Sequence, residues 1–524
     1  MACAPYPVAL NIGNVTLSNG RVARGIDVEI GNPPQHFAFM PKTFYNTTHV
    51  YGGNPYCGLS SLACTTLRGG QYLDQSSSSS VAEVNSAAAG GPPVESALFA
   101  NSTWVQDTLV LAENVTLPAF PLAIAGKNVD NEYEPQTGFG LDVNSTIITT
   151  LKTTGRIVSR TWSFFWGETG AGVTAGIGSN GTLVLGGYDA AKVQGDNLTL
   201  PLNFKDPACG SGLLVSITGL SMVYPNTTAA SLFDGPLQTL EACLRPGATN
   251  LMSLPYTYYQ KFEAISQTTA NAERSVGVNF YGMLFPTTSS YYGDLKFQIN
   301  SVLEITIKNS QLIQPDVSIG DDGFLVASSS TNELFINSLP PGATEDGQST
   351  ALGLARQFFS AAMLMVNQDA GTFTLWLAKP SSDQDLIAID PRGEPVDTFC
   401  SSTPKSTTVS NSTGPSNTSS SHQPDPKPTP IGAIAGGAVG GVVVLCVIAG
   451  ILYLLRRNRR AKARARAANA QSQLVGESFA DHAGQGPLPY TKHHELPYKP
   501  YGSELGHGAS FHELGGRDPA ELAS

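Results

Sequence analysis

The sequence has few charged residues and little helical periodicity. Only 14% of its 524 residues are charged, and the net charge of −11 is spread along most of the chain. This balance argues against nucleic acid as a partner of the main domain. Short alternating runs bounded by Gly, Pro, Asn and Asp take the place of long helices, and they predict an all-β domain made of many antiparallel strands.

The strand pattern is clearest in residues 25–31, 104–117, 181–189, 294–307 and 371–378. A helical period occurs in two short segments, residues 149–157 and 256–265. Both are too short to build a helical domain. The globular part is predicted to span residues 1 to about 400.

Several motifs of enzyme chemistry are missing. The chain has no G-x-S-x-G, no H-E-x-x-H and no phosphate-cradling glycine loop. Its eight histidines show no ligand spacing in the globular part, and most lie in the C-terminal tail. We therefore expect neither a metal ion nor a cofactor.

Cysteine is scarce, with seven residues, and its distribution suits an oxidising compartment. Six cysteines lie before the apolar segment that starts at Ile431, and the seventh, Cys446, lies within that segment and is left without a partner. The expected disulfide pairs are Cys57 with Cys64, Cys209 with Cys243, and Cys3 with Cys400.

One uncharged apolar run, residues 431–455, is long enough to cross a bilayer, for which about 20 residues suffice. The basic run that starts at Arg456 predicts that the following tail, residues 456–524, is cytoplasmic. A Ser/Thr/Pro-rich segment, residues 401–430, precedes the span and is typical of a glycosylated stalk. We expect a single-pass plasma-membrane protein whose N-terminal side lies outside and whose tail is mostly disordered.

N-glycosylation sequons lie on one side of the predicted span alone, which supports the same orientation. The candidate acceptors are Asn14, Asn46, Asn101, Asn114, Asn144, Asn180, Asn197, Asn226, Asn411 and Asn417. The first ten residues do not have the pattern of a signal peptide. We therefore expect the sequence to be a processed form or an incomplete gene model.

Several segments, in chain order, resemble the pepsin-like aspartic proteases. "GNPPQHFAF" (31–39) is similar to the strand that leads to the first catalytic D-T-G-S, and "TGFGLD" (137–142) resembles the strand at the base of that lobe. "YLDQSSSSSVAEV" (72–84), "GRIVSRTWSFFWG" (155–167), "GTLVLGGYDAAKVQGD" (181–196) and "LGLARQFFSAAMLMVNQDAGTFTLWLA" (352–378) match later family segments. The resemblance implies an N-terminal lobe (1–200) and a C-terminal lobe (201–400) with a peptide-sized cleft between them.

The resemblance also implies where the two catalytic aspartates would stand. The first D-T-G-S falls on residues 42–45 and the second motif falls on residues 245–248, which puts Lys42 and Arg245 at the aspartate positions. The family's chemistry needs two carboxyl groups that share a proton. A lysine and an arginine cannot reproduce that pair. We therefore expect no catalytic residues and no aspartic endopeptidase activity.

Other acids were considered as replacements. Asp234, Asp321 and Asp322 are not followed by the turn and the Leu-Pro of the family motif, so we expect them to be solvated loop residues. The tyrosine-glycine pair of the family's flap is missing near residues 97–107, where Asn101 could carry a glycan instead.

Three functional hypotheses remain. The first is a non-catalytic surface module that binds a peptide or a glycan in its cleft, similar to single-pass protease-like surface proteins of filamentous fungi. The second is a membrane-anchored aspartic endopeptidase with an atypical site, and the third is a glycosylated wall or adhesion component. Two cations facing each other at residues 42 and 245 would favour an acidic ligand, whereas pairing with nearby carboxylates would not. Repeated short H-E-L or S-E-L units with tyrosines in the tail could bind cytosolic partners.

Overall fold

A computed structural model of the chain describes residues 5–400 except 54–56, 58–60, 74–77, 85–98, 100, 127–128, 130–133, 170–177, 207–208, 236–237, 271–272, 290, 340–351 and 397. All described residues belong to one compact unit, Met1–Ser412. The predicted stalk, membrane span and tail lie outside them. Across this part of the chain, no helix is long and apolar enough to cross a membrane.

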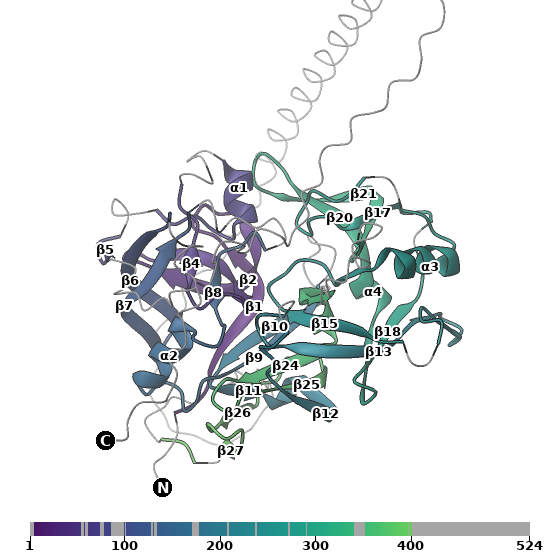
Figure 1. The fold of residues 1–524 in the computed structure, drawn as a ribbon. Helices are drawn as coiled ribbons and strands as arrows, with labels where there is room; N and C mark the ends of the chain where they lie inside the picture. Colours follow the sequence, from purple (N-terminus) through teal and green to yellow (C-terminus); the bar gives the residue numbers. More distant parts are fainter. Residues whose placement is uncertain are drawn as a thin grey trace, which may run out of the picture. The chain divides into compact units, whose positions relative to one another are not determined.

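The prediction of a mostly β fold is confirmed (Figure 1). The largest sheet of the described chain has thirteen strands and contains residues from both predicted lobes. Its spatial order is β12 (Val193–Pro201), β25 (Thr372–Ala378), β24 (Ala362–Asn367), β9 (Thr161–Thr169), β10 (Gly178–Leu185), β1 (Val8–Thr16), β2 (Val22–Ile30), β3 (Gln35–Lys42), β8 (Gly138–Gly140), β4 (His49–Val50), β7 (Val115–Ile124), β6 (Thr103–Ala112) and β5 (Ala82–Glu83).

A second sheet belongs to the predicted C-terminal lobe. Its order is β19 (Leu303–Ile307), β18 (Asp294–Ile299), β13 (Leu214–Val223), β15 (Leu240–Arg245), β23 (Leu352–Ala355), β16 (Met252–Leu254) and β22 (Ile336–Ser338), with β14 (Ala229–Ser231) beside β13. Two further sheets have three strands each. One has the order β11 (Gly187–Asp189), β26 (Leu386–Ile389) and β27 (Pro395–Val396), and the other has the order β17 (Met283–Pro286), β21 (Leu325–Leu334) and β20 (Ile313–Ile319). All five segments with the clearest strand pattern form strands.

The helices are short, as predicted. They are α1 (Leu62–Leu67), α2 (Thr146–Thr153), α3 (Tyr256–Ser266) and α4 (Asn309–Leu312), with 3₁₀ turns η3 (Ala190–Lys192) and η4 (Arg356–Ser360). Helix α2 begins where the Ser145 side chain accepts the Ile148 backbone N–H, and it buries Ile147, Ile148 and Leu151. The predicted helices at 149–157 and 256–265 correspond to α2 and α3.

Two strand units have the same order and the same strand directions. The first consists of β3, β8, β4 and β7, and the second consists of β15, β23, β16 and β22. In each unit the first pair is parallel, the second antiparallel and the third parallel. The domain therefore contains an internal structural duplication, and the two units are called the first and second strand unit below.

The two predicted lobes share a hydrophobic core. A single cluster of buried side chains extends from Val8 in β1 to Leu375 in β25. The Phe164 ring of β9 meets the Phe359 ring of η4 edge to face at 5.5 Å between centroids. This contact joins distant chain segments, so burial of apolar surface stabilises the lobes together.

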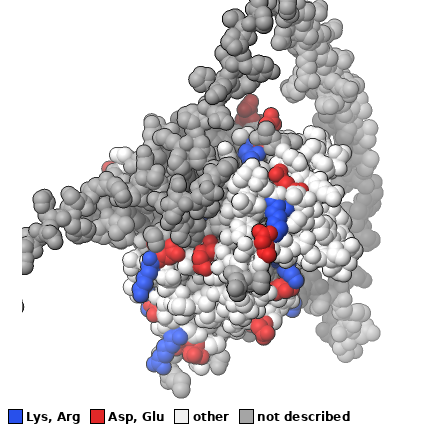
Figure 2. All heavy atoms as spheres, turned by 45° about the vertical axis from the view of Figure 1, so that its right-hand side comes forward, with Lys and Arg blue, Asp and Glu red and all other residues white. Residues whose placement is uncertain are grey.

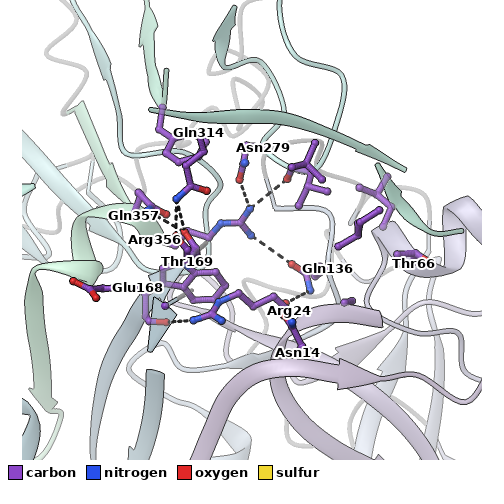
Figure 3. A pocket seen from close by; sticks show the side chains of 18 of the residues that line it. Asn14, Arg24, Thr66, Gln136, Glu168, Thr169, Asn279, Gln314, Arg356 and Gln357 are labelled. Atoms are coloured by element: carbon purple, nitrogen blue, oxygen red, sulfur yellow. Dashed lines mark hydrogen bonds between the residues drawn. The ribbon is translucent and has the colours of Figure 1, made fainter. Parts of the chain in front are cut away.

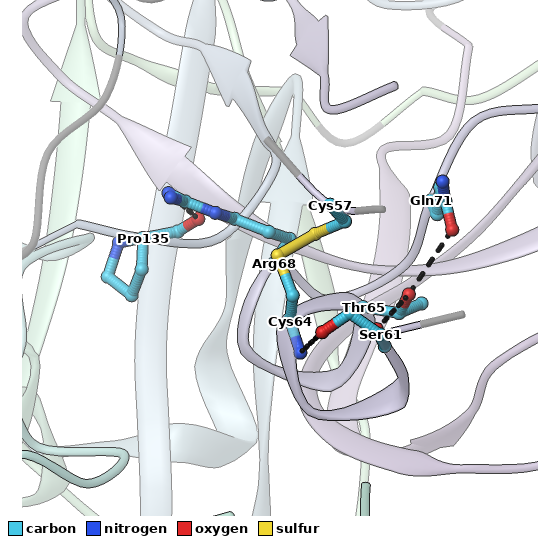
Figure 4. The surroundings of a disulfide bond; sticks show 7 residues. All are labelled: Cys57, Ser61, Cys64, Thr65, Arg68, Gln71 and Pro135. Carbon is cyan, nitrogen blue, oxygen red and sulfur yellow. Dashed lines mark hydrogen bonds between the residues drawn. A yellow bond between two sulfur atoms is a disulfide. The ribbon is translucent and has the colours of Figure 1, made fainter. Parts of the chain in front are cut away.

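Two of the predicted disulfides are present. Cys57 bonds to Cys64 beside α1 (Figure 4), and Cys209 bonds to Cys243 at β15. Cys400 is also disulfide-bonded, and its predicted partner Cys3 lies outside the described residues. Cys446 lies outside them as well.

Charged side chains do not form a broad patch of one sign on the face drawn in Figure 2. Acidic and basic groups occur there in small mixed groups between large uncharged areas. Recognition by this face would therefore need local contacts, since a weak and mixed field steers ligands poorly.

Candidate functional site

Lys42 and Arg245 occupy equivalent positions in the two strand units. Lys42 is the last residue of β3 and is paired in register with Gly140 of the parallel strand β8. Arg245 is the last residue of β15 and is paired with Ala355 of the parallel strand β23. The structure thus places both cations at equivalent strand ends.

The turns that follow the two cations also correspond. The Tyr45 backbone N–H donates to the Lys42 carbonyl at 3.4 Å, and the Ala248 N–H donates to the Arg245 carbonyl at 3.1 Å. In both units the donor lies three residues after the cation. The duplication therefore extends from the strands into the turns, although the turn sequences share no residue.

Lys42 is buried and pairs with Glu134. The lysine is 1% exposed, its Nζ donates to the Glu134 carbonyl at 2.7 Å, and it lies 3.5 Å from Glu134 Oε2. Burial lowers the pKa of Lys42 to about 8, while the Glu134 carboxylate acts in the opposite direction. Lys42 therefore keeps its positive charge at neutral and acidic pH.

Arg245 packs on an aromatic ring. Its guanidinium carbon lies 4.6 Å from the centroid of the Phe44 ring, a cation–π contact. Phe44 stands two residues after Lys42, and its counterpart in the second unit is Gly247. A side chain on Gly247 would lie 2.0 Å from the Pro41 carbonyl oxygen, so the second turn approaches the first closely. The phenylalanine fills space beside Arg245.

The idea that the two cations face each other is not supported by these contacts. Lys42 pairs with a carboxylate, and Arg245 packs against Phe44. For Lys42 this is the alternative in which a nearby carboxylate pairs with the cation, whereas among the described residues Arg245 has no carboxylate partner and its buried Nε has no acceptor. The inference of an acidic ligand between residues 42 and 245 therefore loses its basis.

The other acids considered as replacements lie away from the two turns. Asp234 is exposed and pairs with Lys261 at 2.5 Å. Asp321 and Asp322 are exposed in the turn between β20 and β21, as expected for loop acids. Of the predicted flap region, residues 97–107, only residues 97, 98 and 100 lie outside the described ones; its second half belongs to β6, and Asn101 is exposed beside the start of that strand.

The predicted glycosylation sites differ in accessibility. Asn14, Asn101, Asn114, Asn144, Asn180, Asn197 and Asn226 are exposed, whereas Asn411 and Asn417 lie outside the described residues. Asn46 is 6% exposed, and its side-chain oxygen accepts the Asn144 backbone N–H at 2.7 Å. Because Asn46 is buried, we expect the folded chain to carry no glycan at this position.

A cavity of about 370 Å³ opens next to the Lys42–Glu134 pair and is lined by residues of both predicted lobes. We call it the inter-lobe pocket (Figure 3). Pro135 and Gln136, which follow Glu134, form part of its wall. Its volume lies within the range of about 300–1,000 Å³ that small-molecule sites usually have.

Two arginines line this pocket, Arg24 from β2 and Arg356 from η4. Their guanidinium carbons lie 4.8 and 5.2 Å from the centroid of the Trp166 ring. Burial lowers the pKa of each arginine to about 10, and for Arg24 the charge of Arg356 adds to the effect. Both side chains remain positively charged at physiological pH.

Helix α1 contacts the turn between β20 and β21 (Figure 1). The Thr66 hydroxyl donates to the Gly323 carbonyl at 2.9 Å. Arg21 packs over the Phe324 ring at 4.2 Å from its centroid. The Cys57–Cys64 disulfide fixes the base of α1, and Arg68 donates to the Pro135 carbonyl at 3.2 Å (Figure 4).

A buried histidine lies next to the first strand unit. His49 begins β4, is fully buried and contacts the rings of Tyr45, Tyr51 and Phe99. Burial is the main cause that lowers the pKa of His49 to about 3, and the positive charge of Lys42 is the second. The ring is therefore neutral over most of the acid range, and it serves as a packing residue.

Glu134, Arg24, Arg356 and His49 carry no motif, and sequence reasoning missed them. The one signal was a charged residue inside an apolar run, as in "LGLARQFF", where Arg356 stands. Among the described residues, no group of three or more His, Cys, Asp or Glu could hold a metal ion.

The two strand units and the close approach between them agree with the pepsin-like fold that the sequence resemblance predicted. Among solved structures, the chain is similar to the aspartic proteinase from Irpex lacteus, with 15% identity and a TM-score of 0.46, over 71% of this chain and 98% of that one. No family model matches the sequence. No curated protein matches it either.

Proposed function

We propose that the pepsin-like domain is a non-catalytic binding module. The observation that supports this most is the chemistry at the two equivalent strand ends, which carry Lys42 and Arg245. Peptide hydrolysis by this fold requires a carboxylate that accepts a proton from water and a second carboxyl that donates one. Neither cation can serve as the carboxylate, and an arginine in particular does not release its proton in proteins.

The contacts around these residues support the same proposal. The carboxylate paired with Lys42 belongs to Glu134, and the ion pair engages it within the first lobe. Phe44 occupies the position at which the duplicate unit has Gly247, and it packs against Arg245. Among the described residues, no hydrogen bond joins Glu134 to a second carboxyl group with which it could share a proton.

The proposal extends to the remainder of the chain as it was predicted from sequence. Residues 431–455 would anchor the domain in the plasma membrane, the segment 401–430 would raise it above the surface, and the tail would contact cytosolic partners. The domain would then bind an extracellular peptide or glycan without cutting it.

A cleavage assay tests this proposal. The purified full-length chain is incubated with a peptide library from pH 3 to pH 8, and products are identified by mass spectrometry. We expect no cleavage that depends on the protein. The Glu134→Gln variant is the matched control, because cleavage that it abolishes would show that Glu134 is a working carboxylate. That result would favour an atypical endopeptidase.

A further inference from the structure

The inter-lobe pocket contains an excess of positive charge without a matching acid. Arg24 donates to the Trp166 carbonyl at 2.9 Å and to the Ser179 carbonyl at 3.3 Å. Arg356 donates to the Asn279 side-chain oxygen at 2.7 Å and to the Val278 carbonyl at 3.3 Å. All these acceptors are neutral. Within the described residues, neither guanidinium has a carboxylate at ion-pair distance.

The acids nearest to the pocket do not balance these charges. Glu168 lines the pocket, but it pairs with Lys308 at 2.8 Å. Glu333 is buried and accepts a hydrogen bond from Asn279 at 3.2 Å, and burial raises its pKa well above the usual range. A carboxyl group that tends to keep its proton is a poor counter-ion for Arg356.

Two hydrogen-bond donors of the same cluster have no acceptor in the described structure. They are Nε of Arg24 and Nε1 of Trp166, and both atoms are buried. A buried donor without an acceptor costs free energy, as does a buried charge without a counter-charge. Both costs would be relieved by the same kind of ligand, one that has negatively charged oxygens.

We propose that the inter-lobe pocket binds a carboxylate-bearing ligand, an acidic side chain of a peptide or a uronic acid of a glycan, between Arg24 and Arg356. The planar fork of a guanidinium matches the two oxygens of a carboxylate. Figure 3 shows Arg24 and Arg356 on different elements of the pocket wall, with Gln136 beside the Arg356 guanidinium and the Arg24 backbone. Gln136 accepts from Arg356 at 3.5 Å and donates to the Arg24 carbonyl at 2.9 Å, so one side chain links the two arginines.

This inference rests on the binding role proposed above and names the ligand class for it. The acidic site differs from the one suggested by sequence. It lies at residues 24 and 356, which the sequence did not single out, whereas residues 42 and 245 are engaged by internal contacts.

Calorimetric titration of the purified full-length chain at low salt tests the proposal with two matched pairs of probes. One pair is glucuronic acid and glucose, and the other is acetyl-Glu-Glu-amide and acetyl-Gln-Gln-amide. The protein is deglycosylated first, because the exposed sequon residues Asn14 and Asn180 border the pocket. We expect one acidic probe to bind at least 10-fold more tightly than its neutral counterpart, and the pair that responds identifies the source of the carboxylate.

Variants assign the binding to the pocket. Arg24→Gln should lower the affinity for the acidic probe by about 10- to 100-fold, since a hydrogen bond to a charged group is lost. Arg24→Lys, which keeps the charge but loses the fork, should fall between Arg24→Gln and the natural chain. Arg156→Gln is the matched control, because it makes the same charge change at an exposed position outside the pocket.

Three results would overturn the proposal. They are equal binding of acidic and neutral probes, no binding of either acid, and equal affinities of Arg24→Gln and Arg156→Gln. Thermal unfolding of each variant verifies that it is folded, and if Arg24→Gln does not fold, the Arg24→Lys comparison decides. The cleavage assay tests the non-catalytic role separately. If the protein binds no acidic probe and also cleaves no peptide, the carboxylate-ligand proposal is refuted and the proposal that the domain is non-catalytic is not.

Discussion

The Lys42–Glu134 pair allows a quantitative prediction about the stability of the domain. The two side chains are 1% and 9% exposed and lie 3.5 Å apart, so each neutralises a charge that water cannot reach. Lys42→Met leaves the Glu134 carboxylate alone, and Glu134→Gln leaves the ammonium alone. The double variant removes both charges together.

The expected magnitudes follow from this geometry. Removing one partner of a buried ion pair costs about 3–5 kcal/mol. Glu134→Gln should lie near the lower end, about 3 kcal/mol, because the Glu134 backbone carbonyl still accepts from Lys42. The double variant should cost less than either single one, because replacement of a whole buried pair is often neutral. The coupling energy, which is the sum of the two single costs minus the cost of the double variant, should therefore be about 3 kcal/mol or more.

The natural chain, the two single variants and the double variant form a double-mutant cycle. Their free energies of unfolding are measured by urea titration at pH 7, followed by tryptophan fluorescence. The four proteins should share one m value, so that differences in midpoint report differences in stability. Single variants whose effects add to within about 0.5 kcal/mol would refute the reasoning. A Lys42→Met variant as stable as the natural chain would do the same, since the lysine would then not hold Glu134 in place.

Three further predictions concern single residues. The pKa of His49 is about 3 in the folded chain and 6.5 ordinarily, so as the pH falls the unfolded chain binds a proton at a higher pH than the folded chain does. Protonation of His49 should therefore lower the free energy of unfolding by about 3 kcal/mol between pH 7.5 and pH 4. In urea titrations, the stability of His49→Phe should depend less on pH than that of the natural chain. Gly247→Ala places a methyl group 2.0 Å from the Pro41 backbone carbonyl of β3 and should cost about 1–3 kcal/mol in thermal unfolding. Gly235→Ala, which meets nothing within 4 Å, should cost far less, and equal losses would contradict the close approach. Asn114→Gln should remove one glycan from the mass of the purified chain, while Asn46→Gln should leave the mass of the glycans unchanged and lower the stability. A glycopeptide at Asn46 would show that its burial is wrong.

The strands and turns could be predicted from sequence because their signals are local. Alternation in "WVQDTLVLAENVTL" (104–117) predicted the strands that became β6 and β7, and the motif order placed Lys42 and Arg245 at equivalent strand ends. Both cases depend on residues that are near neighbours in the chain or on a motif of known spacing.

The contacts that determine the chemistry join distant residues, and they could not be predicted in the same way. Lys42 and Glu134 are 92 positions apart, and Arg24 and Trp166 are 142 apart. No periodicity in the sequence links such pairs. The Asn46 sequon shows the same limit. Its three-residue pattern does not reveal that Asn46 is buried in the fold and accepts a hydrogen bond from the Asn144 N–H.

Calorimetric titration of the full-length chain with a pepstatin-type inhibitor tests the central claim most directly. The hydroxyl of such an inhibitor stands in for the attacking water and is held by two carboxyl groups that share a proton. With Lys42 and Arg245 at the two strand ends, the account predicts no binding between pH 3 and pH 7. Tight binding that strengthens as the pH falls would contradict it, because that result requires a pair of carboxyl groups in the cleft.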